Sequence, residues 1–437
     1  MNTKHRIILF LTLISFSFSG IAQQIDFSGA TIINPEKKNP QIGKAVQVLK
    51  EEIQKRTNLL LQVAEKPSTK TKLTIWVGVE SRLDKLSGQS KSTLAQLPPT
   101  GKDGFKVILA DNQTIVIAGH DERGVLYGAG WLLRKSEMYS NKILVPQKTS
   151  VSSTPTYPIR GHQLGYRPKT NAYDAWTVAQ YDQYIRDLAI FGANSIEIMP
   201  PRTDDDFTSV NMKLPAIKMI AEQSRICKEY GLDMWMWYPN MGSDYTNADS
   251  IKKELDEREK VFSVLPKLDA LFVPGGDPGD LEPDVLFGWL AKEAVVLHEY
   301  HPNAKIWVSP QVFKPSDEWY KKFYEHVNRE YDWLGGVVYG PWIRTPLAEV
   351  RKLIKPNIPI RLYPDITHSL SCQYPVPNWD LAYAMTLGRE CINPRPEDEK
   401  FIQNKYAGLA QGSISYSEGT NDDVNKFVWT GQDWNPQ

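Results

Sequence analysis

Eight short apolar stretches alternate with helix-like segments over residues 159–418, and this alternation is the feature that most restricts the fold. Each stretch is bounded by Gly, Pro or Asp, as β-strands commonly are. The expected strands are residues 159–166, 195–199, 232–238, 270–273, 305–309, 335–339, 359–363 and 413–416. Eight strands joined by helices close a (β/α)8 barrel, so the sequence predicts a TIM barrel over residues 151–437.

Helix-like segments lie between these strands, and residues 177–191 give a clear example. Apolar Val178, Tyr181 and Leu188 recur at helical spacing and would share one face, with polar residues between them. An amphipathic helix of this kind can cover the crossover between two neighbouring parallel strands.

Residues 23–150 show a different rhythm and predict a separate small α+β domain before the barrel. The pattern predicts a helix, four strands and a second helix at residues 41–56, 59–64, 73–79, 105–109, 114–118 and 121–134. Polar residues 81–102 are expected to form a loop inside this domain, and residues 149–158 a linker to the barrel.

Residues 1–22 have the pattern of a secretory signal peptide. Lys4 and Arg6 precede the apolar stretch 7–18, and small residues follow at the expected cleavage site. We therefore expect the mature chain to start near Gln23 and to be periplasmic or secreted; a single membrane anchor is the alternative. No later apolar stretch is long enough to span a membrane, so none is expected in the mature chain.

The amino-acid composition limits the classes of molecule that the protein is expected to bind. The chain has 51 basic and 51 acidic residues, so its overall field attracts neither nucleic acid nor an anionic membrane. Three cysteines are too few for a disulfide-built scaffold, so the fold must rest on its core. The 13 Trp and 20 Tyr are numerous and favour a carbohydrate partner slightly, because aromatic faces serve as platforms for sugar rings.

Two motifs carry a resemblance to known enzymes. Residues 117–134, IAGHDERGVLYGAGWLLR, resemble the end of the small α+β domain that precedes the catalytic barrel in bacterial β-N-acetylhexosaminidases and α-glucuronidases. Residues 155–161, PTYPIRG, resemble the entry into the first barrel strand of those glycoside hydrolases. The resemblance implies an exo-acting glycoside hydrolase that acts on a glucuronide or an N-acetylhexosaminide.

The end of the fourth strand departs from the related families. It lacks the Asp-Glu pair of the hexosaminidases and the Asp-Asp pair of the related O-GlcNAc hydrolases. The sequence therefore gives the architecture of this superfamily without placing the chain in one family.

Three carboxylic acids follow barrel strands and are the catalytic candidates. Asp277 and Asp280 follow the fourth strand, and Glu418 follows the eighth. Glycosidic cleavage requires an acid together with a second carboxylate or a substrate amide, and we expect Asp277 as the acid and Glu418 as base or nucleophile. The alternative for the two aspartates is a role in capping turns and the next helix. The separation of the carboxylates would decide between retention and inversion, and the sequence leaves it open.

Polar and aromatic residues at the other strand ends are the candidates for substrate binding, although several are expected to be packing residues. They are Gln163, Arg167, Arg202, Tyr238, Asn240, Gln311, Tyr339, Trp342, Tyr363, Asp365 and His368.

Two sets of side chains correspond to the two substrate classes. Arg167, Arg202 and Arg344 would suit the carboxylate of a glucuronide. An aromatic cage for an acetamido group would come from Trp237, Tyr339 and Trp342. Glu197, a single charge between Ile196 and Ile198, would point into the barrel if it is functional.

Other chemistries receive little support. His298 and His301 have the wrong spacing for a zinc protease helix, and residues 124–130 lack the dinucleotide-binding order of glycines. Neither a metal ion nor a cofactor is expected.

A non-catalytic carbohydrate-binding protein on a degenerate barrel is the alternative function. A homodimer would shelter the short closing helix expected at residues 424–429.

Overall fold

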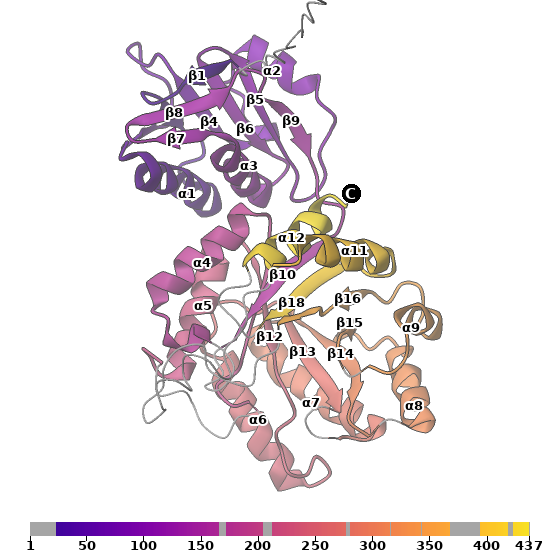
Figure 1. Ribbon diagram of the computed structural model, residues 1–437. Helices are drawn as coiled ribbons and strands as arrows, with labels where there is room; N and C mark the ends of the chain where they lie inside the picture. The colour runs from indigo at the N-terminus through magenta and orange to yellow at the C-terminus, as the bar shows by residue number, and fades with distance from the viewer. Residues whose placement is uncertain are drawn as a thin grey trace, which may run out of the picture.

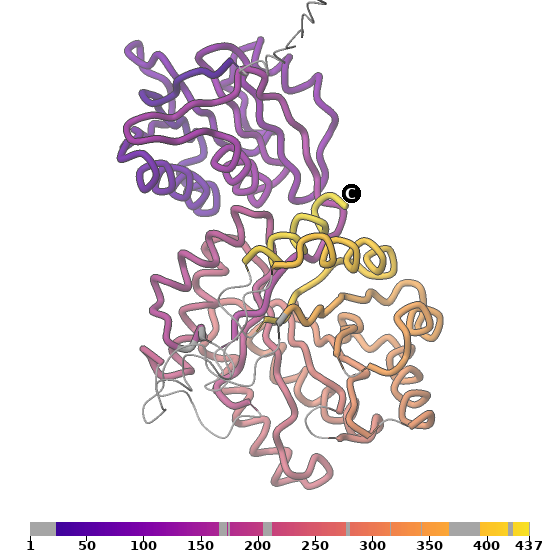
Figure 2. The backbone as a smooth tube through the Cα atoms, viewed as in Figure 1, coloured from indigo at the N-terminus to yellow at the C-terminus, as the bar shows by residue number. Residues whose placement is uncertain are grey.

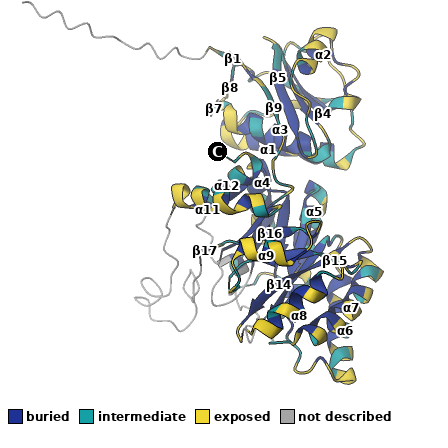
Figure 3. Cartoon of the chain, turned by 90° about the vertical axis from the view of Figure 1, so that its right-hand side faces the viewer, coloured by how far each residue is buried: buried dark blue, intermediate teal, exposed yellow. Residues whose placement is uncertain are grey.

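A computed structural model describes residues 23–165, 172–203, 212–276, 280–314, 316–341, 343–367, 394–417 and 423–436. The chain forms a barrel and a smaller N-terminal unit beside one end of it (Figure 1). The barrel strands and the central strands of the N-terminal sheet are largely buried, and many exposed residues lie on the outer faces of the helices (Figure 3). The predicted fold class, a parallel eight-stranded barrel after a small α+β domain, is confirmed.

The N-terminal unit is built on a six-stranded mixed sheet with the order β3-β2-β4-β6-β5-β9. Strands β2, β3, β4 and β6 are parallel, whereas β5 runs antiparallel to β6 and β9. The bounds are β2 Thr31–Ile33, β3 Gln62–Ala64, β4 Thr74–Val79, β5 Phe105–Asp111, β6 Thr114–Gly119 and β9 Ser150–Ser153. A second sheet, β1-β8-β7, consists of β1 Gln24–Asp26, β7 Glu137–Tyr139 and β8 Lys142–Pro146.

Helices cover both faces of the six-stranded sheet. Helices α1 (Pro40–Thr57) and α3 (Glu122–Lys135) pack on one face and join the main core. Helix α2 (Gly88–Ala95) lies on the other face, where Leu94 belongs to a smaller apolar cluster. The expected loop at 81–102 is therefore wrong, because it contains α2 and the short helix η1 (Glu80–Arg82). The expected linker at 149–158 is also wrong in part, since its first half is strand β9.

The barrel sheet has the order β10-β11-β12-β13-β14-β15-β16-β18 and closes through pairing of β10 with β18. The register at closure places Ile159 beside Gly412 and His162 beside Ser415. The bounds are β10 Ile159–Leu164, β11 Ser195–Ile198, β12 Asp233–Trp237, β13 Ala270–Gly276, β14 Lys305–Val312, β15 Leu334–Tyr339, β16 Ile360–Leu362 and β18 Gly412–Ser417. All eight predicted strands are confirmed; a further short strand, β17 (Asp365–Thr367), pairs with β18.

Helices surround the barrel on its outer side (Figure 1). They are α4 Val178–Ile190, α5 Ala216–Tyr230, α6 Ala248–Phe262, α7 Pro283–Tyr300, α8 Asp317–Val327, α9 Leu347–Leu353, α11 Pro396–Tyr406 and α12 Asp423–Trp434, with the short helices η2 Ala172–Ala175 and η3 Ala407–Leu409. Helix α4 begins at a capping box in which Thr177 and Gln180 exchange side-chain and backbone hydrogen bonds. Its predicted apolar face is buried through Tyr181 and Leu188.

Glycines of α3 allow close packing where the two units meet. A Cβ atom on Gly130 would lie 2.7 Å from the carbonyl oxygen of Ile190 in α4, so only glycine fits there. Within the N-terminal unit, a Cβ on Gly124 would lie 2.0 Å from the carbonyl oxygen of Gly104. The glycines at 124–130 thus serve helix packing.

Asp103 joins the two units. The residue is 2% exposed, and its carboxylate forms ion pairs with Arg160 Nη2 and Arg123 Nε, both at 2.8 Å. The amide of Asn194 donates to the same carboxylate at 3.1 Å. Burial alone would raise the pKa of Asp103, but Arg123 and Arg160 outweigh it and lower that pKa below its usual value.

The residues around Asp103 place the N-terminal unit at the amino ends of the barrel strands. Arg160 is the second residue of β10, and Asn194 precedes β11. Arg123 also binds Asp233, the first residue of β12, at 2.9 Å. Figure 2 shows that the chain passes from one unit to the other beside the C-terminal helix. The carboxyl ends of the strands therefore lie on the far side of the barrel.

Removing the Asp103 charge is predicted to destabilise the whole chain, because it leaves fully buried Arg160 without its anionic partner. We expect Asp103→Ala to lower the free energy of unfolding at pH 7 by about 3–5 kcal/mol, measured by urea denaturation. Asp103→Asn is the matched control for shape, since Asn also tolerates the left-handed backbone (φ 63°) found here.

The acid dependence follows from the lowered pKa of Asp103. Stability from this group is present above its unfolded-state pKa and disappears as the pH falls through the folded-state value. The deficit of Asp103→Asn should therefore shrink in strong acid. A deficit that is constant from pH 7 to strong acid would contradict the ion-pair role.

Asp433 holds the last helix against the barrel. Its carboxylate accepts from Gln403 Nε2 of α11 at 2.8 Å and from the Ser413 hydroxyl of β18. Asp433 is fully buried, and this burial raises its pKa to about 7 despite those hydrogen bonds and nearby Arg160.

A raised pKa predicts that stability is lost as the pH rises. Between the unfolded and folded pKa values only the folded state holds the proton, so this group lowers the unfolding free energy by about 1.4 kcal/mol per pH unit. We expect Asp433→Asn to remove that decline between pH 5 and 7 in urea titrations. Equal pH slopes for parent and variant would contradict the assignment.

Candidate active site at the carboxyl ends of the barrel strands

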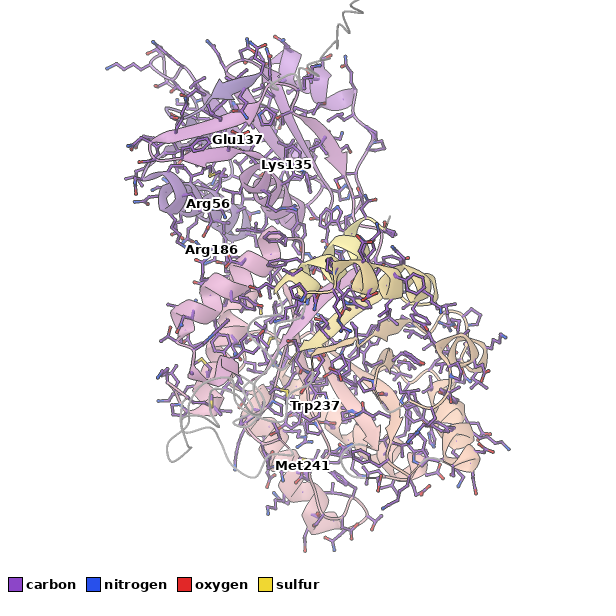
Figure 4. The ribbon with its side chains drawn as sticks, viewed as in Figure 1. Arg56, Lys135, Glu137, Arg186, Trp237 and Met241 are labelled. Atoms are coloured by element: carbon purple, nitrogen blue, oxygen red, sulfur yellow. The ribbon has the colours of Figure 1, made fainter. Side chains whose placement is uncertain are left out.

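The candidate site lies at the end of the barrel remote from the N-terminal unit. Arg56 and Arg186 mark the junction of the two units in Figure 4, whereas Trp237, the last residue of β12, and Met241 lie far from it. In a (β/α)8 barrel the carboxyl ends of the strands form the mouth in which ligands are bound.

Four side chains form a buried chain near this mouth. Gln163, next to last in β10, donates from Nε2 to Glu197 Oε1 at 3.0 Å and to the Tyr363 hydroxyl at 3.1 Å. The other carboxylate oxygen of Glu197, on β11, accepts from Arg361 Nη2 on β16. Two of the four, Gln163 and Tyr363, were predicted as substrate-binding residues, and the structure brings them together.

Aromatic rings surround the cation of this chain. The guanidinium carbon of Arg361 lies 4.7 Å from the centroid of the Trp235 ring and 4.9 Å from that of Phe272. Both Glu197 and Arg361 are fully buried. Burial raises the pKa of Glu197 although Arg361 opposes the shift, and burial lowers the pKa of Arg361 although Glu197 opposes it.

Sequence reasoning missed Arg361 as a site residue. The available signal was a single charged residue between Ile360 and Leu362, the same pattern that singled out Glu197. A lone charge inside each of two apolar strands indicates a pair across the barrel interior.

Three other predicted residues lie in a second polar cluster between β12 and helices α6 and α7. Arg202 Nη2 binds both oxygens of Glu254 at 2.6 and 2.7 Å, and Arg202 Nε binds Glu257 at 3.0 Å. The ring of Tyr238 lies 3.9 Å from the guanidinium of Arg258. Asn240 Oδ1 accepts from the Trp289 indole at 2.9 Å. Arg202, Tyr238 and Asn240 thus pack against side chains of α6 and α7.

The remaining described candidates are spread around the mouth. Gln311 is buried in β14, and Asp365 begins β17. The Tyr339 hydroxyl donates to the carbonyl oxygen of Thr345 at 3.3 Å. Tyr339 and Asp365 both line a cleft of about 320 Å³ between β15, β16 and helices α9 and α11. Asp280, with φ 43°, pairs with exposed Lys314 at 2.8 Å.

Several predictions fall on residues outside the described ranges. They are Asp277, Glu418, Arg167, Trp342 and His368. Strand β13 ends at Gly276 and β18 at Ser417, so the residue that follows each strand in the chain is one of the two predicted catalytic acids. Arg344, considered for a glucuronide carboxylate, is exposed.

The histidines near the end of α7 have structural partners. His298 Nε2 lies 2.9 Å from the carbonyl oxygen of Ala304, and His301 Nε2 lies 3.0 Å from that of Phe262. Within the described ranges, no three His, Cys, Asp or Glu side chains gather closely enough to bind a metal ion.

No helix in that same part of the chain has the length and apolar content needed to cross a bilayer.

Comparison with known families gives one match. Residues 23–130 match the model of the glycosyl hydrolase family 67 N-terminus. The match covers the N-terminal unit and leaves the barrel unassigned, so it does not place the whole chain in a family. A search of curated proteins gives no match.

Solved structures with the same fold include several glycosidases. A family GH115 4-O-methyl-α-glucuronidase with specificity for decorated arabinogalactans has 13% identity and a TM-score of 0.64, covering 94% of this chain and 57% of that one. The Streptomyces plicatus N-acetyl-β-hexosaminidase has 10% identity and a TM-score of 0.57, with coverages of 94% and 88%. A Vibrio harveyi GH20 exo-β-N-acetylglucosaminidase has 11% identity and a TM-score of 0.56, with coverages of 94% and 71%.

At these identities the structural matches establish the shared fold. This chain spans little more than half the length of the glucuronidase, 57%. The chain shares the fold of these glycosidases, and its N-terminal unit matches a glycosyl hydrolase N-terminus, as the sequence motifs implied.

The buried pair predicts a defined stability pattern. Arg361→Met leaves Glu197 buried without its cation and should lower the free energy of unfolding by about 3–5 kcal/mol in urea titrations. The double variant Glu197→Gln/Arg361→Met removes both charges and should lose less than Arg361→Met alone. A double-variant loss that equals the sum of the single losses would contradict the pairing.

Proposed function

We propose that the protein is an exported, exo-acting glycoside hydrolase that acts on a glucuronide or an N-acetylhexosaminide. The observation that carries the proposal is the closed parallel barrel preceded by a unit matching the family 67 N-terminus. The same order of units occurs in sugar-cleaving enzymes that share this fold. Fold alone does not determine chemistry, so the proposal also rests on the strand ends.

The catalytic roles are assigned by position along the chain. Asp277 directly follows β13 and is proposed as the acid that protonates the leaving oxygen. Glu418 directly follows β18 and is proposed as the base or nucleophile. Asp280 stays a third candidate, although its carboxylate already pairs with Lys314.

Polar groups at the mouth would hold the sugar. Gln163 and Tyr363 belong to the buried chain below the strand ends, and Trp237 closes β12 with a largely buried ring. An aromatic face and a few fixed polar groups are the usual makeup of a sugar subsite. Arg202 contributes indirectly, because its contacts with Glu254 and Met241 fix the segments after β11 and β12.

The choice between the two substrate classes depends on arginine and aromatic side chains, and some of these already contact other protein groups. Of the arginines considered for a glucuronide carboxylate, Arg202 is neutralised by Glu254 and Glu257. Of the aromatic residues considered for an acetamido group, Tyr339 lines the cleft beside α9 and α11. Both substrate classes therefore belong in the test.

Export and assembly complete the proposal. Residues 1–22 are proposed to be a cleaved signal peptide, which directs the mature chain to the periplasm or the medium. The mature protein is further proposed to form a homodimer.

Hydrolysis is tested on the mature protein, residues 23–437, with nitrophenyl glucuronides, N-acetylhexosaminides and plain hexosides. We expect turnover of one of the first two classes and a loss of about 10²–10⁴-fold in kcat for Asp277→Asn and Glu418→Gln, as expected for acid and base catalysts. Asp280→Asn tests the third candidate and should lose less, because the Asp280 carboxylate already pairs with Lys314.

An outcome without turnover would contradict the proposal. Glycan binding that persists in Asp277→Asn and Glu418→Gln, with no hydrolysis by the parent, would identify a non-catalytic carbohydrate-binding protein.

A further inference from the structure

Helix α11 has its polar and apolar sides reversed relative to an ordinary surface helix. Its buried residues are Glu399 and Gln403, which bind the Trp429 indole at 2.7 Å and the Asp433 carboxylate at 2.8 Å, both on α12. A helix on the surface of a globular protein normally turns its apolar residues toward the core. The side chains that hold α11 in place are therefore polar.

The apolar side chains of α11 face solvent. Phe401 is 66% exposed, Ile402 39% and Tyr406 38%. Figure 3 shows the exposed residues along the outer side of this helix. Single exposed apolar residues are common on proteins, but three large ones within two turns form an apolar patch. A patch of this kind is typical of a surface that another protein covers.

Charges of opposite sign lie at the two ends of this patch. Glu397 and Asp398 are exposed in the first turn of α11, and Lys405 is exposed in its last turn. Lys405 Nζ lies 5.7 Å from the centroid of the Phe401 ring and 5.5 Å from that of Tyr406, so the cation borders the patch. Neither Asp398 nor Lys405 has an ion-pair partner among the described residues. Both charges are therefore available to a partner molecule.

The exposed side of α11 is complementary to itself when two copies of the helix run antiparallel. A two-fold axis between Phe401 and Ile402 places each of these residues against the other one in the second copy. The same axis places Asp398 opposite Lys405 of the second copy, so an ion pair flanks the apolar contact at each end. Antiparallel helices also bring opposite ends of their dipoles together.

A cleft beside α11 adds a shape match to the charge match. The cleft of about 320 Å³ between β15, β16 and helices α9 and α11 is bordered by Ile402 and Tyr406, with buried Leu347 and Leu362 in its wall. In the antiparallel register Phe401 of one copy faces Ile402 of the other, and it therefore faces this cleft. A projecting side chain and a cleft side by side on one surface are what a two-fold contact needs.

We propose that α11 is the two-fold interface of a homodimer, with its exposed side packed antiparallel against the same side of a second copy. The residues in contact are Glu397, Asp398, Phe401, Ile402, Lys405 and Tyr406. This gives the homodimer proposed above a definite surface, and it does not depend on hydrolysis. One pair of helices covers less than the roughly 800 Å² per partner of a standard interface, so the dimer should dissociate at micromolar concentrations.

Charge reversal tests the register. Asp398→Lys places two lysines opposite each other at each end of the interface, and Lys405→Asp places two aspartates there. Each variant alone should raise the dissociation constant at least about tenfold in sedimentation equilibrium at low ionic strength, where exposed charges are least screened. A mixture of the two variants should regain a dimer as tight as that of the parent, because each end then joins opposite charges.

The apolar contact is tested separately. Phe401→Ser should also raise the dissociation constant at least about tenfold, because it removes the side chain that faces the cleft. Matched controls make the same changes on other helices: Asp249→Lys alters an exposed acid in the first turn of α6, and Val295→Ser alters an apolar residue of α7 that is 63% exposed. Both controls should dimerise within about twofold of the parent.

The outcomes separate this proposal from the hydrolase function. A parent that stays monomeric at high micromolar concentration would overturn the proposal, as would a dimer that none of the α11 variants weakens or that the controls weaken equally. Weakening by each charge variant without recovery in the mixture would overturn the antiparallel register. Turnover of a sugar by a monomeric parent would leave the hydrolase function standing, whereas a dimer of the predicted kind without turnover would leave only the interface standing.

Discussion

The ion pair between Glu197 and Arg361 crosses the interior of the barrel and constrains everything built around it. The two charges come from the second and seventh strands of the barrel sheet, β11 and β16, so they meet only when the sheet is closed. Both side chains are fully buried, and neither could stay charged there alone. The polar chain below the mouth can therefore form only when the barrel is closed.

A second buried charge organises the opposite end. Asp103 binds the side chains of Arg123, Arg160 and Asn194. These contacts fix the N-terminal unit to the starts of β10, β11 and β12. The contact leaves the carboxyl ends of the strands uncovered by the N-terminal unit. The N-terminal unit is accordingly a structural support at the base of the barrel, remote from the proposed chemistry.

The sequence predicted the barrel well because each strand is a short apolar stretch ended by Gly, Pro or Asp. Helix α2 was missed because its sequence, GQSKSTLA, offers little apolar periodicity. It forms because Ser87 caps it and Leu94 anchors it to the sheet. Strand β9 was missed because polar residues SVSS form an edge strand that pairs only with β5. Tertiary packing decided both elements, and local pattern could not show it.

The site was only partly predictable for a related reason. Position at a strand end does not determine whether a side chain faces the mouth or the helices, since neighbouring residues of a strand point to opposite sides. Gln163 and Tyr363 meet inside the barrel, whereas Tyr238 and Asn240 contact groups from α6 and α7. Arg361 was not predicted because it lies within β16, whereas position at a strand end was the basis for most candidates.

We propose that a sugar binds at the carboxyl ends of the strands, above the Glu197–Arg361 pair. The most direct measurement is a crystal structure of the mature protein soaked in turn with glucuronic acid and N-acetylglucosamine. We expect a sugar ring at the mouth, with one oxygen within hydrogen-bonding distance of the Tyr363 hydroxyl. A sugar bound only on the N-terminal unit or on the outer helices would contradict it.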